Sequence, residues 1–435
     1  MARSRLSLAR VLLVGLLAPL VAADAGSNHE GGGSADGLAS EPIQKVEIYT
    51  DNATVPTPPT DGWWESKICV NSFCVYSNRR LAKGRGLVAV TKLEEFQKLE
   101  RIEDHLERGE NKYLQSPIPF VTTEVLSKGP GLTATSPIRR GKPLFVFTPV
   151  LVVHKSLFDH VPKKKDRTHL LESAISLLPA DTQAKFNAQR PRADEGSPPR
   201  SIEQILLANP FEIDLGYATH KQDPDNHSKH YVNYPEAAAF QHDCRPNVAT
   251  HIDGAFALRA TVARRVALGE ELTFSYVDPF QDRRERAAWV GKHRSRGAEG
   301  SEKAGCPCAA CSPKGGVKGE AGVEGEKRLK EILAIRAELR NHDSTKVDFK
   351  MIERFLKLYE EERLHFKLAE AYELAAMNFN YLGDDKRAQK YADLAVQAGI
   401  VEGGAESNDV VATRVFAKDV KGHYSYRYTL KRKGL

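Results

Sequence analysis

Four cysteines in the second half of the chain have the residue type and the spacing that bind a metal ion. Cys306, Cys308 and Cys311 form a C-x-C-x2-C run, and Cys244 is the only other cysteine near them in the sequence. A structural zinc ion takes four tetrahedral ligands, and four thiolates leave no open position for a water molecule. A four-thiolate zinc site would bring the start of the segment 240–311 against its end. The alternative is that these cysteines are unpaired or form disulfides.

Two further motifs lie in the same segment. Residues 241–247 read Gln-His-Asp-Cys-Arg-Pro-Asn, and residues 270–276 read Glu-Glu-Leu-Thr-Phe-Ser-Tyr. Between them, Asp253-Gly254 separates two apolar-rich runs. Asp-Gly favours a two-residue primed turn, because both central residues of such a turn need a positive φ. The pattern therefore predicts a β-hairpin between the two motifs.

Together these motifs resemble the catalytic half of the SET-domain protein lysine methyltransferases. Residues 241–247 are similar to the family's Asn-His-Ser-Cys-x-Pro-Asn, residues 270–276 to its Glu-Glu-Leu-Thr-x-x-Tyr, and the three late cysteines to its post-SET zinc motif. The resemblance covers residues 119–312. The C-terminal helices are closer to the SMYD-like branch, although no cysteine-rich block remains that could form that branch's MYND finger. Gln241 stands where the family has Asn, and Asp243 where it usually has Ser.

The resemblance implies an enzyme that transfers a methyl group from S-adenosylmethionine to an accessible lysine of a protein substrate. Free lysine has a pKa of about 10.4, so the site must favour the neutral amine, and desolvation in an apolar channel does so. By resemblance, Tyr276 hydrogen-bonds and orients the amine, and Phe274 helps to set the number of methyl groups added. Without the motif, each would be an aromatic residue in the core of a strand. The alternative function is a catalytically silent SET fold that binds proteins through its helical C-terminus.

The resemblance also assigns the residues that bind the methyl donor. Gly129 and Gly131 would let the backbone approach it closely, although a Gly-x-Gly sequence alone usually marks a turn. Gln241 and His242 would lie under the adenine, with the main chain at position 242 reading its edge and the side chain of Gln241 reaching the methionine part. The structural alternative is a turn that places Cys244, and both readings can hold.

The implied fold is α+β, a SET fold of several small, short-stranded sheets with a knot-like closure in which the Tyr276 segment passes beneath an earlier loop. Leu144 to Val153 is expected to form a strand pair, and Ser201 with Gln204 a helix capping box. His220, His227 and His230 are expected in a solvated loop. The expected organisation is a signal peptide at 1–23, a flexible leader at 24–62, an N-terminal extension at 63–118, the SET domain at 119–278 with a helical insert at 155–231, the post-SET zinc motif at 279–312, a linker at 313–326, and a helical region at 327–435 that contains one tetratricopeptide-like hairpin.

The first 23 residues have the pattern of a secretory signal peptide. Arg3, Arg5 and Arg10 precede an uncharged apolar run from Val11 to Val21, and small residues follow. The alternatives are an uncleaved or mitochondrial leader, and a nuclear or cytoplasmic protein if the leader is not used. In a secretory compartment Cys69 and Cys74 could form a disulfide; two buried thiols are the alternative.

The net charge and the hydropathy of the chain limit the classes of partner that it is expected to have. The formal net charge of +6 falls to +3 without the three arginines of the leader, which is too weak to indicate nucleic-acid binding. No other segment reaches the length of a transmembrane helix. The mature chain is therefore expected to lack a membrane span and to act as a monomer on a protein substrate.

Overall fold

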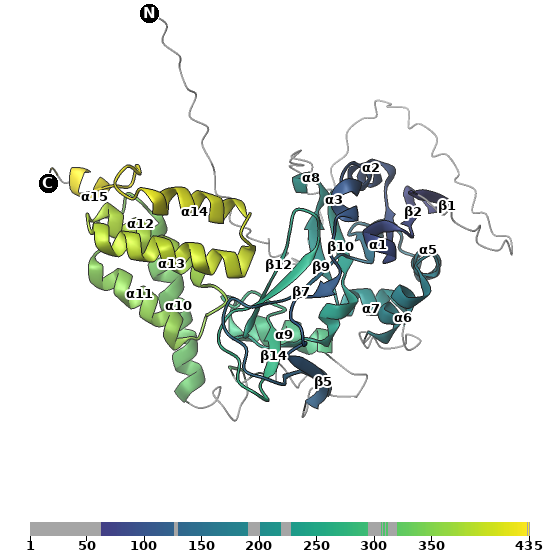
Figure 1. Ribbon diagram of the computed structural model, residues 1–435, viewed down its shortest axis with the longest axis horizontal. Coiled ribbons are helices and arrows are strands. Elements are labelled where there is room, and N and C mark those ends of the chain that lie inside the picture. Colours follow the sequence, from purple (N-terminus) through teal and green to yellow (C-terminus); the bar gives the residue numbers. More distant parts are fainter. Residues whose placement is uncertain are drawn as a thin grey trace, which may run out of the picture. The chain divides into compact units, whose positions relative to one another are not determined.

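The computed structural model describes residues 62–125, 129–189, 201–218, 228–294, 306, 308, 310–311, 320–432 and 434. These residues belong to one compact unit, Val46–Leu435. The described residues form three sheets and a set of C-terminal helices, as Figure 1 shows, so the expected α+β class is confirmed. The predicted signal peptide and nearly all of the predicted leader lie outside the described residues. None of the described helices is both long and apolar enough to cross a membrane.

The largest sheet joins the N-terminal strands to strands that follow residue 150. Its order is β1-β2-β3-β8-β10-β9, with β3 and β8 parallel and the other neighbours antiparallel. Every residue of β3 and β8 is buried, as expected for apolar strands in the middle of a sheet. The disulfide between Cys69 and Cys74 joins β1 to β2. The strands are β1 (Trp64–Val70), β2 (Phe73–Asn78), β3 (Leu87–Thr91), β8 (Leu151–His154), β9 (Phe211–Asp214) and β10 (Lys229–Asn233).

Two four-stranded sheets complete the strand framework, with the orders β11-β14-β6-β5 and β12-β13-β7-β4. The predicted strand pair between Leu144 and Val153 forms as two strands, β7 and β8, but they lie in different sheets and do not pair with each other. Pro149 lies between them and has no N–H to continue a ladder, so the chain changes sheets there. The strands are β4 (Lys112–Tyr113), β5 (Phe120–Val125), β6 (Gly129–Ala134), β7 (Pro143–Phe147), β11 (Gln241–His242), β12 (Val248–Ile252), β13 (Leu258–Val262) and β14 (Glu271–Phe274).

The predicted hairpin between the two motifs is present as β12 and β13, but the predicted two-residue turn is wrong. Ile252 pairs with Leu258, so five residues connect the strands. The Asp253 carboxylate accepts hydrogen bonds from the backbone N–H groups of residues 255 and 257, at 2.9 and 3.0 Å, and closes this longer loop. Phe256 takes the positive φ, at 56°, and its side chain is buried. Burial of this ring outweighs the local preference of Asp-Gly for a tight turn.

Four of the helices before the C-terminal region, α2, α5, α7 and α8, contact strands of the largest sheet. α5 contacts β1, β2 and β3. The predicted capping box is confirmed, because Ser201 and the Gln204 side chain each bond the other's backbone at the start of α7. The helices are α1 (Leu81–Gly84), α2 (Leu93–Arg101), α3 (Glu103–Glu107), α4 (Leu157–His160), α5 (Lys164–Ser176), α6 (Ala180–Ala188), α7 (Ile202–Ala208), α8 (Leu215–Ala218), the 3-10 helix η1 (Pro235–Ala239) and α9 (Arg283–Arg294).

His230 does not lie in a solvated loop, which corrects the expectation from sequence. It lies in β10 between β8 and β9 and is fully buried. Its Nε2 atom is 2.7 Å from the Thr91 hydroxyl, and its Nδ1 atom is 2.7 Å from the Ser228 carbonyl oxygen. Burial lowers its pKa to about 3, so the ring is neutral. His220 and His227 lie outside the described residues.

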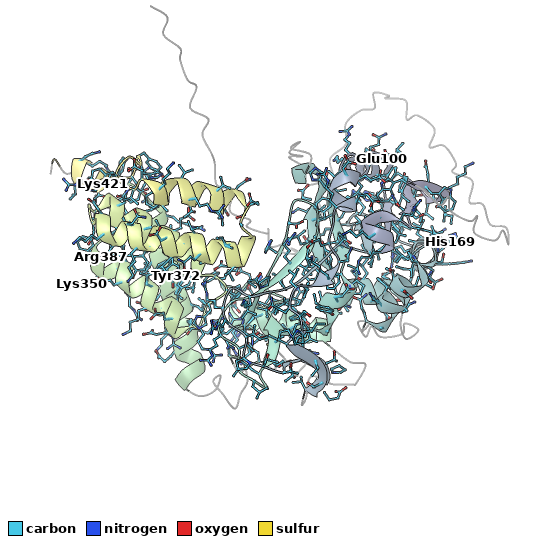
Figure 2. All side chains as sticks on the ribbon, in the orientation of Figure 1. Glu100, His169, Lys350, Tyr372, Arg387 and Lys421 are labelled. Atoms are coloured by element: carbon cyan, nitrogen blue, oxygen red, sulfur yellow. A yellow bond between two sulfur atoms is a disulfide. The ribbon has the colours of Figure 1, made fainter. Side chains whose placement is uncertain are left out.

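The C-terminal region is helical, and α10 already begins at Glu320, inside the segment expected as a linker. The predicted hairpin is formed by α12 and α13, which a three-residue connection joins and which pack against each other. α13 also packs on β12 and β13, so the region contacts the hairpin that lies between the two motifs. In Figure 2, Lys350, Tyr372, Arg387 and Lys421 mark this region, and Glu100 and His169 mark α2 and α5. The helices are α10 (Glu320–Arg340), α11 (Phe349–Glu361), α12 (Leu368–Tyr381), α13 (Asp385–Gly403), α14 (Asn408–Lys418) and α15 (Tyr428–Arg432).

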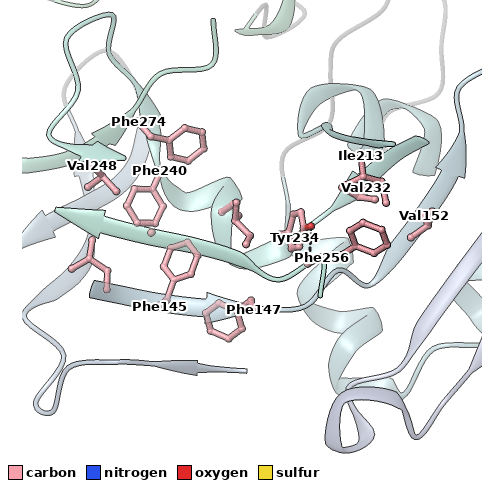
Figure 3. Packing of buried hydrophobic residues seen from close by; sticks show 14 of the residues in the cluster. Phe145, Phe147, Val152, Ile213, Val232, Tyr234, Phe240, Val248, Phe256 and Phe274 are labelled. Atoms are coloured by element: carbon pink, nitrogen blue, oxygen red, sulfur yellow. Dashed lines mark hydrogen bonds between the residues drawn. The ribbon is translucent and has the colours of Figure 1, made fainter. Parts of the chain in front are cut away.

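One hydrophobic core connects all three sheets. Figure 3 shows Phe145, Phe240 and Phe274 following one another through this core. The ring centroids of Phe145 and Phe240 are 5.5 Å apart, and those of Phe240 and Phe274 are 5.6 Å apart. The buried Tyr234 hydroxyl donates to the Phe256 carbonyl oxygen at 2.6 Å. This aromatic core supports the end of β14, where the second motif terminates.

Candidate active site and cysteine cluster

The two motifs lie side by side because β11 and β14 pair. β11 runs parallel to β14, with His242 opposite Phe274. The buried Asn247 fixes the first motif to the second: its amide donates to the Glu271 carbonyl oxygen at 2.8 Å and accepts from the Thr273 N–H at 2.9 Å. A single amide side chain thus satisfies two backbone groups of β14 and holds both motifs in register.

Tyr276 is held at both its main chain and its hydroxyl. Its hydroxyl donates to the Phe240 carbonyl oxygen at 2.5 Å, and its backbone N–H donates to His242 Nδ1 at 3.0 Å. A phenol has one proton and two lone pairs, so a hydroxyl that gives its proton to a carbonyl can only accept from a further partner. The site therefore offers a fixed acceptor oxygen at Tyr276.

A cavity of about 300 Å³ beside Tyr276 has aromatic walls. The ring of Tyr276 is 5.2 Å from that of Phe274 and 6.3 Å from that of Trp289, and Phe211 lies 6.1 Å from Phe274. Of these four residues, sequence reasoning selected Tyr276 and Phe274 and missed the other two. Phe211 begins β9 and Trp289 lies in α9, so neither is close to a motif in the sequence. Such a cavity suits an alkyl chain that ends in an amine or ammonium group.

The predicted Gly-x-Gly segment lies against the first motif. β6 pairs with β14, and the Gln241 amide donates to the Pro130 carbonyl oxygen at 2.6 Å. A Cβ atom at Gly131 would lie 2.9 Å from the Val125 side chain, 3.1 Å from the Glu271 carboxylate and 3.2 Å from Cγ of Gln241. Only glycine fits this approach without displacing a neighbour. The structure thus places Gly131 against Gln241, which precedes His242 in β11, and Gly129 begins the same strand as Gly131.

The family comparison agrees with this geometry. A family model described as SET domain matches residues 129–277. Residues 129–277 are a SET domain. The match begins at Gly129 and ends just after Tyr276, so it contains both motifs and the Gly-x-Gly segment. No curated protein matches the chain.

The cysteines that follow the SET domain fold back onto it. Cys244, Cys306, Cys308 and Cys311 are all buried and share one cluster. The sulfur of Cys244 lies 3.9 Å from that of Cys306 and 3.6 Å from that of Cys311. Hydrogen bonds within the cluster raise the pKa of Cys244 and lower that of Cys311. The four thiols therefore do not ionise together unless a cation joins them, and the donor set fits a tetrahedral zinc ion.

His242 connects the cysteine cluster to Tyr276. Its Nε2 atom lies 3.2 Å from the Cys244 sulfur, and it belongs to a group with Cys244, Cys306 and Cys308 whose potential ligand atoms lie within 4.8 Å of one another. Because Nδ1 accepts the N–H of Tyr276, the proton of a neutral ring is on Nε2 and points to the sulfur. A protonated Nε2 cannot bind a metal ion, so Cys311 is the better fourth ligand. His242 then orients a ligand sulfur and the Tyr276 main chain at once.

A second cavity, of about 290 Å³, lies between the SET domain and the C-terminal helices. Thr250, Phe274, Ser275 and Tyr276 line both cavities. From the C-terminal region, Phe366, Lys367 and Glu402 complete the second one. The two cavities are therefore neighbours that meet at the end of the second motif.

Proposed function

We propose that this SET-domain protein is an S-adenosylmethionine-dependent protein-lysine N-methyltransferase. SET domains in general use this donor and act on lysines of protein substrates, which supports the proposal. The observation that carries it is the Tyr276 hydroxyl. It lies at the wall of an aromatic cavity and already donates its hydrogen bond to the Phe240 carbonyl oxygen.

The aromatic cavity would receive the acceptor lysine. Its walls desolvate the side chain, which lowers the pKa of an amine, and the faces of aromatic rings attract a cation that enters. The Tyr276 oxygen, as a fixed acceptor, would take a hydrogen bond from an N–H of the amine and so aim its lone pair. Phe274 is 7 % exposed at the same wall, where its ring limits the space for added methyl groups.

The donor-binding residues would be Gly129, Gly131, Gln241 and His242. Bound S-adenosylmethionine supplies an electrophilic methyl group on a sulfonium ion. Gly131 leaves room for a close backbone approach, and the buried ring of His242 fixes the main chain at this position. Zinc, held by Cys244, Cys306, Cys308 and Cys311, would be structural, because four thiolates leave no open position.

Methyl transfer by the purified mature chain tests the proposal. The wild type and Tyr276→Phe would be incubated with labelled S-adenosylmethionine and a library of lysine-centred peptides. We expect incorporation by the wild type and a loss of orders of magnitude in the variant, with donor affinity by calorimetry unchanged within a few-fold, because the hydroxyl acts on the amine. Full activity of Tyr276→Phe would show that Tyr276 is only a core residue.

One observation favours the second function, a catalytically silent binding module. The Gln241 amide already donates to the Pro130 carbonyl oxygen. The family's Asn is one methylene shorter, which would leave its amide for the methyl donor. A wild type that binds no S-adenosylmethionine would support this alternative.

For localisation we propose the secretory pathway, with the nucleus or cytoplasm as the alternative if the leader is not used. The Cys69–Cys74 disulfide supports the proposal, because disulfides persist in oxidising compartments. Sequencing of the mature N-terminus from the native host should start near Asp24, and an intact Met1 on a cytosolic protein would contradict it.

A further inference from the structure

The second cavity is placed to contact the residues that flank a lysine bound in the aromatic cavity. Both cavities use Thr250, Phe274, Ser275 and Tyr276 as walls. An extended peptide advances about 3.3 Å per residue, so a residue within about three positions of the lysine reaches a neighbouring cavity of this size.

Glu402 is the acidic group at the C-terminal side of this cavity. It belongs to the last turn of α13, and one carboxylate oxygen accepts the N–H of Ala369 at 2.8 Å, at the start of α12. No Lys or Arg nitrogen of the described residues lies within 4.0 Å of its carboxylate. Burial raises the pKa of Glu402 to about 7, although the positive charges of Lys367 and Arg140 act in the opposite direction. A cation that enters the cavity would complete an ion pair that the chain itself leaves incomplete.

The other charged groups around the cavity do not fill this role. The Lys367 ammonium lies 6.0 Å from the centroid of the Phe366 ring and forms no ion pair with Glu402 among the described residues. The Arg140 guanidinium Nε donates to the Ala263 carbonyl oxygen at 3.0 Å. Asp278 is exposed at the cavity wall and adds a second negative charge. The cavity therefore presents two carboxylates and one lysine to an incoming chain.

We propose, as an extension of the proposed function, that Glu402 is a specificity-determining residue that selects substrates with an arginine or lysine within about three positions of the methylated lysine. Arginine fits better, because a planar guanidinium can bond a carboxylate with two N–H groups. The Glu402 carboxylate would accept these bonds, while the backbone N–H groups of Leu368 and Ala369 hold it in place.

Pools of peptides that differ only in the charge of one side chain test this inference. In lysine-centred libraries, one position from −4 to +4 is fixed either as arginine or as its neutral analogue citrulline. Methyl transfer and peptide affinity, by fluorescence anisotropy, are measured for the wild type, Glu402→Gln, Lys367→Gln and the control Glu406→Gln. Glutamine can still accept the Ala369 N–H, so Glu402→Gln should fold, and Glu406 is an exposed acid on the same region.

At one position the wild type should prefer arginine over citrulline by about tenfold. Glu402→Gln should reduce this ratio to near one. Lys367→Gln should raise the ratio, and Glu406→Gln should leave it unchanged. A ratio near one in the wild type, or one that Glu402→Gln does not change, overturns the inference while methyl transfer stands. If the wild type binds the arginine pool more tightly than the citrulline pool but methylates neither, the inference about Glu402 stands and the proposed function is overturned.

Discussion

Arg245 and Glu362 form a buried ion pair between the first motif and the C-terminal helices, with Nη2 and Oε2 2.8 Å apart. Arg245 is 4 % exposed and also donates to the Cys244 carbonyl oxygen at 2.7 Å. Arg328 of α10 binds the other carboxylate oxygen of Glu362 at 2.6 Å. One carboxylate at the end of α11 therefore anchors the loop that carries Cys244.

Removal of this carboxylate should destabilise the chain strongly. Glu362→Ala leaves the buried Arg245 guanidinium without its counter-ion, which costs about 3 kcal/mol of unfolding free energy. The measurement is urea unfolding followed by circular dichroism, with Glu360→Ala, an exposed acid two residues away, as the control. Equal midpoints for the two variants would show that the ion pair is dispensable.

The sequence predicted those features that depend on residue type and on spacing along the chain. The convergence of Cys244 with Cys306, Cys308 and Cys311 follows from residue type and spacing, and the structure brings them together. The turn after Ile252 could not be predicted, because the side chains of Asp253 and Phe256 override the local preference there.

The walls of the two cavities could not be predicted either. Phe211 and Trp289 reach the aromatic cavity from β9 and α9, and Glu402 reaches the second cavity from α13. Tertiary packing alone places them there, and no periodicity or motif marks them. His230 illustrates the converse case, since its polar surroundings in the sequence gave no sign that sheet pairing buries it.

The cysteine cluster should contain one zinc ion per chain. Cys308→Ser should lose the metal and, with it, the cooperative folding of the segment after the SET domain, because metal binding and folding are coupled. Metal analysis of the purified chain measures this, and the double variant Cys69→Ser/Cys74→Ser, which removes only the disulfide, should retain the zinc. A wild-type chain that folds without zinc would contradict the prediction.

Glu402 should make the stability of the chain depend on pH in a defined direction. Burial raises its pKa from the ordinary 4.5 to about 7, so between these values the folded state binds more protons than the unfolded state. Its contribution to stability therefore decreases as the pH rises through this range. Glu402→Gln should have a higher urea midpoint than the wild type at pH 8 and the same midpoint at pH 4. A difference that is equal at both pH values would exclude ionisation of Glu402 as its cause.

Gln241→Asn should improve donor binding. In the wild type the long side chain places its amide on the Pro130 carbonyl oxygen, at 2.6 Å, and asparagine is one methylene too short to keep that bond. Its amide would then face the space that the family's Asn occupies, and one additional hydrogen bond to a polar group is worth about 1 kcal/mol, or roughly fivefold to tenfold in affinity. Titration calorimetry with S-adenosylmethionine measures the change. Pro130 is exposed, so its carbonyl can bond water instead and the variant should remain as stable as the wild type.

The second departure from the family pattern supplies the control. Asp243 Oδ1 accepts the Arg245 N–H at 2.8 Å, and a serine hydroxyl can accept the same bond, so Asp243→Ser should leave the donor affinity unchanged. A wild type with weak binding that only Gln241→Asn improves would identify position 241 as the residue that limits donor affinity. If neither the wild type nor Gln241→Asn binds S-adenosylmethionine, the site is closed for a reason other than this amide. The SET domain would then be a binding module, with the C-terminal helices as its contact surface.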